Sequence, residues 1–419
     1  MDMLPIAVYP SVVEEFLPKV REGFSKPQLK QFARYLTGLI VCDNKTVSAI
    51  NDSFVGHNDQ SALNNWLTDS DWSDEKLDKA RKELIKEEQK AKNITRGVLI
   101  LDDTINHKTG RHMEGVNMHF DHAEGKTTLG HQLVTTHLAT GKFSVPLGFE
   151  LYQRNEDQAD FKSKNELAKT LIAKAVADGF CFDRVVMDVW YFNFENTSYI
   201  ESLGKDWVAG CKINRLIQTG EDYVSLESYL KSVPATDFKM VSVKTTKGER
   251  HFWTYAKNVT LKKHHQRLRV VFSYLDEKLT GEPKVLATNK LNWDVKTILE
   301  TYLLRWKIDA FYRDAKQELG LEDYEVRKLQ GLKRHWLMVF LADTLLQLNA
   351  KADVFVEHVK SGRLETVGST CRYAALEILR SFINLVLKLA EKAKTADEIL
   401  KYTLSDLKEI KTLYQMELS

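Results

Sequence analysis

Two aspartates stand directly after short apolar runs that have the length of a buried strand. Asp102 follows Gly97–Leu101, and Asp188 follows Val185–Met187. Carboxylates at strand ends can converge at one edge of a sheet, and carboxylate oxygens are ligands that Mg²⁺ prefers. Asp103 is an alternative to Asp102, because successive strand residues point to opposite faces and only one of them can face the ions.

Two divalent ions need a third carboxylate, and its candidates lie within residues 302–318. On a continuous helix, one stripe consists of Tyr302, Arg305, Asp309, Arg313 and Lys316. Asp314 and Glu318 point away from this stripe, so helix geometry selects Asp309. A solvated surface helix also has a polar stripe, but apolar residues at 303, 304 and 306 argue against full exposure. Arginine and lysine beside a carboxylate suit a phosphate-binding surface, because arginine binds phosphate through paired hydrogen bonds.

A basic segment, residues 239–269, carries nine basic residues and one acid, Glu249. The residues of this segment that we select for DNA contact are Lys244, Lys247, Arg250, Trp253, Lys262, Lys263 and Arg267. Cations beside aromatic rings suit contacts to a DNA backbone and to single strands. The alternative is a solvated β-hairpin, since lysine on an edge strand also blocks aggregation.

Taken together, these motifs resemble those of a known family. The pattern of Tyr302, Arg305, Asp309 and Lys316 is similar to the signature helix of bacterial insertion-sequence transposases, the DDE group with an RNase H-like core. Residues 101–104, followed by Lys108 and Gly110, resemble the first-acid motif of that family, and residues 185–188 resemble the second. The resemblance covers about residues 25–340. One departure is that Asp309 stands where the family usually has Glu, which leaves a working variant and a weakened enzyme both open.

The resemblance implies a DNA transposase that cuts at the terminal inverted repeats of its own insertion sequence and joins the ends to target DNA. It implies catalysis by Asp102, Asp188 and Asp309, which would hold two Mg²⁺ ions, with Mn²⁺ as a substitute. The stripe residues would contact phosphates, and Tyr302 could also stack on a flipped base. The expected partners are double-stranded DNA, both transposon ends and target, and a second copy of the chain in the DNA complex. The alternative is a non-catalytic, sequence-specific DNA-binding protein that kept the fold.

The order of helical and strand-like segments predicts an α/β fold. We expect an RNase H-like mixed sheet with flanking helices, interrupted by a β-rich insertion, with helical regions at both ends. The predicted boundaries are 1–95 for a helical DNA-binding domain, 96–200 and 284–345 for the two parts of the catalytic core, 201–283 for the basic insertion and 346–419 for a C-terminal helical region. Short capped helices in 1–95 fit a helix-turn-helix-like DNA reader, and a plain helical bundle is the alternative.

Composition excludes several classes of protein. The 419 residues contain 60 basic and 58 acidic residues, so a uniformly basic protein of the histone type is excluded, although a local basic surface is not. No apolar run is long enough for a membrane span and no signal peptide is visible. Four scattered cysteines argue against a Cys-ligated zinc site or a disulfide framework. We therefore expect a protein of the bacterial or archaeal cytoplasm, associated with the nucleoid.

Two weaker signals concern phosphate and zinc. Residues 124–127 resemble the end of a phosphate-binding loop, but position 120 is Phe rather than the required first Gly. We therefore expect no nucleotide cofactor. The histidines at 119, 122, 131 and 137 are interpreted as core or surface residues rather than zinc ligands, because no cysteine lies near them.

Overall fold

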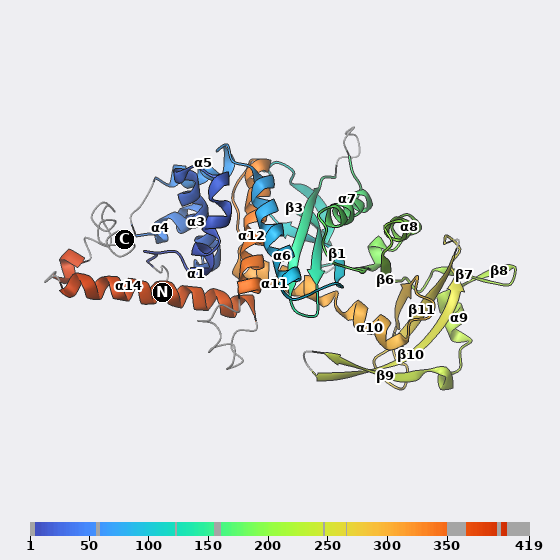
Figure 1. Cartoon of the computed structure of the whole chain (residues 1–419). Helices are drawn as coiled ribbons and strands as arrows, with labels where there is room; N and C mark the ends of the chain where they lie inside the picture. Colours follow the sequence, from blue (N-terminus) through green and yellow to red (C-terminus); the bar gives the residue numbers. More distant parts are fainter. Residues whose placement is uncertain are drawn as a thin grey trace. The chain divides into compact units, whose positions relative to one another are not determined.

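The computed structural model describes residues 5–55, 59–121, 124–154, 161–245, 248–264, 266–349, 366–391 and 395–399 (Figure 1). The chain divides into two compact units. The helical unit comprises Met1–Lys90, Ile105–His131 and Phe311–Ser419. The sheet unit comprises Ala91–Thr104 and Gln132–Ala310.

The sheet unit is built on one large mixed sheet. Its strands, in spatial order, are β4 (Ser144–Tyr152), β3 (Lys126–Ala139), β1 (Val98–His107), β5 (Arg184–Met187), β6 (Asp206–Gly210), β12 (Lys284–Thr288), β11 (Arg267–Tyr274), β10 (Gly248–Thr260) and β9 (Lys239–Thr245). The first residues of β3 and the last residues of β1 belong to the helical unit. β5 runs parallel to both β1 and β6. β3 pairs antiparallel with β4, and each neighbouring pair in the series β6, β12, β11, β10 and β9 is also antiparallel.

Helices cover this sheet, as amphipathic segments do when they bury one apolar face. α7 (Lys164–Ala177) packs on β4, α8 (Phe194–Ser202) on β6, and α10 (Val295–Leu303) on β6 and β9. α7 begins at a capping box in which the side chains of Ser163 and Glu166 each accept from the other's backbone N–H. The predicted fold class, a mixed α/β sheet flanked by helices and accompanied by helical ends, is confirmed.

The segment after α8 is rich in strands, as its alternating pattern indicates. β7 (Leu216–Thr219) and β8 (Asp222–Ser225) form a separate hairpin, followed by α9 (Leu226–Lys231). β9, β10 and β11 do not form a sheet of their own, because β12 joins them to β6 of the core. The insertion therefore extends the core sheet. The domain boundaries drawn from the sequence remain a prediction.

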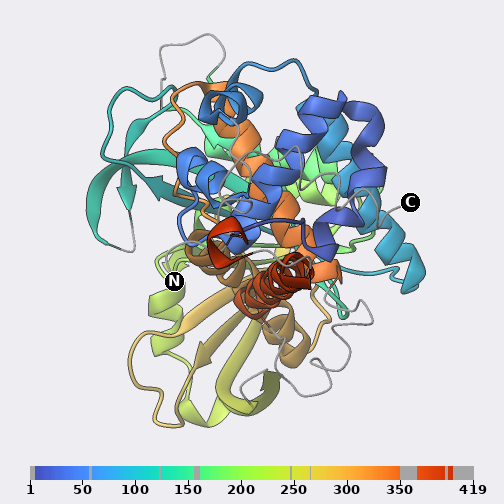
Figure 2. The same cartoon turned by 90° about the vertical axis from the view of Figure 1, so that its left-hand side faces the viewer.

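The helical unit contains α1 (Ser11–Glu14), α2 (Leu17–Val20), α3 (Lys26–Val41), α4 (Val47–Ser53), α5 (Gln60–Thr68), most of α6 (Asp74–Ala91), most of α11 (Trp306–Glu318), α12 (Leu329–Asn349), α14 (Val367–Glu391) and the strand β2 (Asn117–Asp121). α12 contacts α3, α5 and α14, and Figure 2 gives a second view of these helices. α4, α5 and the longer α6 are among the helices expected within residues 1–95. Residues 350–365, 392–394 and 400–419 of the predicted C-terminal region lie outside the described residues. None of the described helices combines the length and the apolar character of a membrane span.

Candidate active site

The first two predicted acids lie side by side on neighbouring parallel segments. Leu101 of β1 is the register partner of Met187 of β5, so Asp102 and Asp188 follow at the next position of each segment. Asp188 directly follows β5, whereas β1 continues to His107, so Asp102 lies within its strand and not at the strand end that the sequence predicts. Burial raises the pKa of Asp102 to about 7, the nearby charges of Asp103 and Asp188 add to this effect, and Arg305 opposes it. A raised carboxyl pKa in a group of acids is typical of a site where charge is concentrated for chemistry.

The third acid joins them through a shared arginine. Nη1 of Arg305 lies 2.5 Å from Oδ2 of Asp102, and Nη2 lies 3.1 Å from Oδ2 of Asp309. Burial raises the pKa of Asp309, Arg305 opposes this rise, and the charge of Asp188 adds to it. Burial alone would lower the pKa of Arg305, but Asp102 and Asp309 outweigh it, so that pKa is raised. Two of the acids, Asp102 and Asp309, thus share one guanidinium within the sheet unit, and the charge of Asp188 acts on the same arginine.

The helix that was expected to carry the stripe is not continuous, which corrects the sequence-based expectation. α10 ends at Leu303, α11 begins at Trp306, and Arg305 lies in the turn between them. The backbone N–H groups of Leu304 and Arg305 donate to residues three positions earlier, at 3.3 and 3.0 Å. Such a tight turn still places residues three and four apart on one side. Arg305 and Asp309 therefore remain in contact although the helix is interrupted.

Tyr302 is buried beside the acids and is only 8% exposed. Burial raises its pKa to about 12, Arg305 opposes the rise, and Asp188 and Asp102 add to it. Gly210 makes room for this ring: a Cβ there would lie 2.7 Å from Cγ2 of Val189 and 3.0 Å from the Tyr302 hydroxyl.

Asp103 lies in a different environment from Asp102. Its Oδ1 accepts from the Tyr191 hydroxyl at 2.7 Å, and its Oδ2 accepts from Lys164 at 3.0 Å and from Gln132 at 2.5 Å. Both oxygens are therefore occupied by donors of the protein. The arrangement favours Asp102 over Asp103 as the acid that faces the ions.

The other two stripe residues lie in the helical unit and are already paired. Arg313 is 58% exposed at its side chain and lies 2.8 Å from Asp314. Lys316 donates to the carbonyl of Ile105 at 2.7 Å and forms an ion pair with Glu322.

The cations selected in the basic segment lie on its surface. Exposed side chains are those of Lys244, Arg250, Lys262, Lys263 and Arg267, whereas Trp253 is partly buried and Lys247 lies outside the described residues. Lys244 stands opposite Glu249 in the β9–β10 register, so part of its charge is balanced locally. Nζ of Lys262 lies 5.0 Å from the ring centroid of Tyr223.

Sequence reasoning missed three residues near the acids. Lys284 of β12 has its pKa lowered by burial, while the charge of Asp188 opposes that shift, so a second cation lies near the site. Trp190 and Trp306 are 53% and 64% exposed, which is unusual for tryptophan. The two tryptophans could have been found from the sequence, because Trp190 lies two positions after Asp188 and Trp306 directly follows Arg305. Lys284 could not, because only the fold brings it near the acids.

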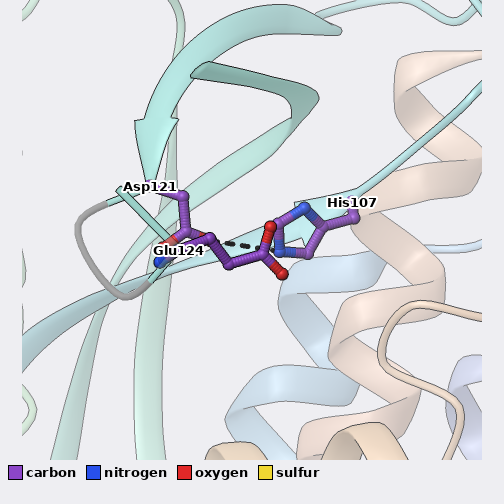
Figure 3. A group of neighbouring side chains, drawn as sticks. All are labelled: His107, Asp121 and Glu124. Carbon is purple, nitrogen blue, oxygen red and sulfur yellow. Dashed lines mark hydrogen bonds and ion pairs between the residues drawn. The ribbon is translucent and has the colours of Figure 1, made fainter. Parts of the chain in front are cut away.

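The acid group suits divalent cations. Three carboxylates in one partly buried place provide hard oxygen ligands, and their excess negative charge is offset here by Arg305. A second group, in the helical unit, consists of His107, Asp121 and Glu124, whose side chains point toward one another in Figure 3. Nε2 of His107 lies 3.2 Å from Asp121, while Lys126 lies 2.8 Å from Glu124 and neutralises it. We assign no metal to this second group.

Comparisons with known proteins find similar sequences over about half of the chain. A model described as DDE superfamily endonuclease matches residues 19–222, a range that contains Asp102 and Asp188 and ends before Asp309. The chain is 29% identical over 221 residues to the probable transposase for insertion sequence element IS701 of Microchaete diplosiphon, which covers 51% of this chain and 57% of that relative. A cryo-EM structure of the piggyBac transposase synaptic complex with hairpin DNA matches with a TM-score of 0.49 and 10% identity, over 94% of this chain and 80% of that chain. Over residues 19–222 the chain is thus similar to the DDE superfamily of endonucleases, and over 221 residues it is similar to an insertion-sequence transposase.

Proposed function

We propose that this protein is a DNA transposase that cuts at the terminal inverted repeats of its own insertion sequence and joins the ends to target DNA. The observation that carries the proposal is that Arg305 pairs with both Asp102 and Asp309, with the charge of Asp188 nearby. The ion pair of Asp309 with Arg305 forms although Asp is shorter than the usual Glu, which supports an active enzyme over a domesticated DNA-binding protein.

In this proposal Asp102, Asp188 and Asp309 hold Mg²⁺, with Mn²⁺ as a substitute. Bound Mg²⁺ supplies activation of a water or a DNA 3′-hydroxyl and stabilisation of the leaving oxygen in an in-line displacement. Arg305 holds Asp102 and Asp309 together, and its guanidinium would bind a DNA phosphate through two hydrogen bonds. Lys284 adds positive charge beside Asp188.

DNA contact is proposed for two parts of the sheet unit. Exposed Trp306 offers a surface on which a base can stack, and the burial of Tyr302 makes Tyr302 less suited to that role. Lys244, Arg250 and Lys263 of the insertion would contact the phosphate backbone. Joining two ends would bring two copies of the chain into one DNA complex, in the cytoplasm near the nucleoid.

The test is cleavage of a duplex that carries the inverted repeats flanking the gene. The wild-type chain should nick this duplex at the repeat boundary with Mg²⁺ and not with EDTA, and it should leave a duplex with scrambled repeats intact. Tight binding to the repeats without nicking in Mg²⁺ or Mn²⁺ would instead identify a DNA-binding protein that has lost the chemistry.

A further inference from the structure

The Asp103 carboxylate is the centre of a hydrogen-bonded group next to the acid site. It accepts from Tyr191, Lys164 and Gln132, and these three donors come from separate parts of the sheet unit. The Asp103 and Lys164 side chains are only 17% and 16% exposed, and Tyr191 is fully buried. Hydrogen bonds to a charged acceptor in such a place are strong and geometrically restrictive.

This group connects the segments that follow Asp102 and Asp188. Asp103 directly follows Asp102, and Tyr191 ends the short 3₁₀ helix Val189–Tyr191 that directly follows Asp188. The 2.7 Å hydrogen bond from the Tyr191 hydroxyl to Asp103 therefore joins the segment behind one acid to the segment behind the other.

The tyrosine is itself fixed from its other side. Its carbonyl accepts from Nδ2 of Asn196 at 2.9 Å, and Asn196 is held in turn by Asn165 at 2.8 Å. Neither end of Tyr191 can shift without breaking a buried or partly buried hydrogen bond, and a buried polar group left without a partner is unfavourable.

The charges in the group have a second effect. The negative charge of Asp103 repels that of its neighbour Asp102. The Lys164 ammonium, 3.0 Å from Asp103, partly offsets that charge. Asp103 is thus held firmly by its hydrogen bonds, and Lys164 limits the electrostatic repulsion between Asp103 and Asp102.

We propose that Asp103 and Tyr191 are positioning residues that fix the separation between Asp102 and Asp188 and thereby set the affinity of the acid site for divalent ions. The inference rests on the proposed function of that site. Residues that orient metal ligands without touching the metal typically change metal affinity by about 10–100-fold when they are removed.

The experiment compares Tyr191→Phe with a matched control, Thr288→Val. Each change removes one buried hydroxyl: that of Tyr191 donates to Asp103, and that of Thr288 donates to the Trp207 carbonyl at 2.6 Å. Both variants should lose similar stability in urea unfolding. Mn²⁺ binding is measured directly by calorimetry on the metal-free full-length protein, and the Mg²⁺ concentration for half-maximal nicking is measured separately.

Tyr191→Phe should weaken Mn²⁺ binding at least about tenfold and raise the half-maximal Mg²⁺ concentration similarly, whereas Thr288→Val should leave both unchanged. Asp103→Asn, which keeps the shape of the side chain but not its charge, should act in the same direction. Equal Mn²⁺ affinity in wild type and Tyr191→Phe, or equal weakening in Thr288→Val, would overturn the proposal. A wild-type protein that binds Mn²⁺ through this group but never nicks DNA would refute the proposed function and leave the positioning role intact. A wild-type protein that does not bind Mn²⁺ would overturn both.

Discussion

Replacing Arg305 with glutamine should destabilise the metal-free protein by an amount that grows with pH. Arg305 lies 2.5 Å from Asp102 and 3.1 Å from Asp309, and its side chain is 22% exposed. It therefore provides the positive charge for two largely buried acids. Without it, Asp102 loses its ion-pair partner and must either stay ionised at higher cost or take up a proton.

The sign and size of this pH-dependent loss of stability follow from the pKa of Asp102, which burial raises to about 7 in the presence of Arg305. Between about pH 4 and pH 7 the folded state holds a proton that the unfolded state has released, so wild-type stability falls as pH rises and then levels off. Loss of Arg305 raises that pKa further, so in the variant the fall continues above pH 7. At somewhat more than 1 kcal/mol per pH unit, the added loss is roughly 1 kcal/mol at pH 8 and roughly 3 kcal/mol at pH 9.

The assay is urea unfolding of wild type and variant in EDTA at pH 6, 7, 8 and 9. The control is Arg313→Gln on α11, because Arg313 is 58% exposed and its ion pair should contribute less than about 1 kcal/mol at every pH. Adding Mg²⁺ at pH 9 should stabilise Arg305→Gln more than wild type, since the ions replace the lost charge. A pH-independent loss equal to that of Arg313→Gln would refute the reasoning.

Three further outcomes are expected. Asp102→Asn should raise stability at pH 8, because it removes a buried charge, while abolishing DNA cleavage; urea unfolding and a nicking assay check the two effects. Asp343→Asn should flatten the decline of stability with pH, because burial raises the pKa of Asp343 well above its usual value. The carboxylate oxygens of Asp343 have no hydrogen-bond partner among the described residues. Urea unfolding at pH 5, 7 and 9 measures the effect, and parallel curves of wild type and variant would contradict it. Replacing Lys244, Arg250 and Lys263 together by Gln should lower the slope of log affinity against log salt for repeat DNA by about one unit per lost phosphate contact, and an unchanged slope would exclude these cations from the interface.

The acid site could be predicted where local pattern determines it. Short apolar runs that end in acids are readable, and the parallel pairing of β1 and β5 brings Asp102 and Asp188 together. Asp309 was selected by helical spacing from Arg305, and the two side chains are in contact as that spacing requires. The interruption between α10 and α11 was not predicted, because tertiary packing determined it and no Pro or Gly marks it.

The surroundings of the site depend on contacts between distant parts of the sequence. Lys284 approaches Asp188 only because β12 pairs with β6, and the hydrogen bonds of Asp103 to Lys164 and Tyr191 cross 61 and 88 positions. No local pattern encodes such contacts. Lys316 was expected to be free for phosphate, but the fold gives it the Ile105 carbonyl as a partner.

The central claim is that three carboxylates act together in DNA cleavage. The most direct measurement is the rate of Mg²⁺-dependent nicking at the repeat boundary by Asp102→Asn, Asp188→Asn and Asp309→Asn, with Asp183→Asn as the matched control. Asp183 precedes β5 and pairs with its neighbour Arg184 at 2.8 Å. Each of the three variants should lose at least about a hundredfold in rate while still binding repeat DNA, and the control should cleave like wild type. Full cleavage by Asp188→Asn, or an equal loss in the control, would contradict the account.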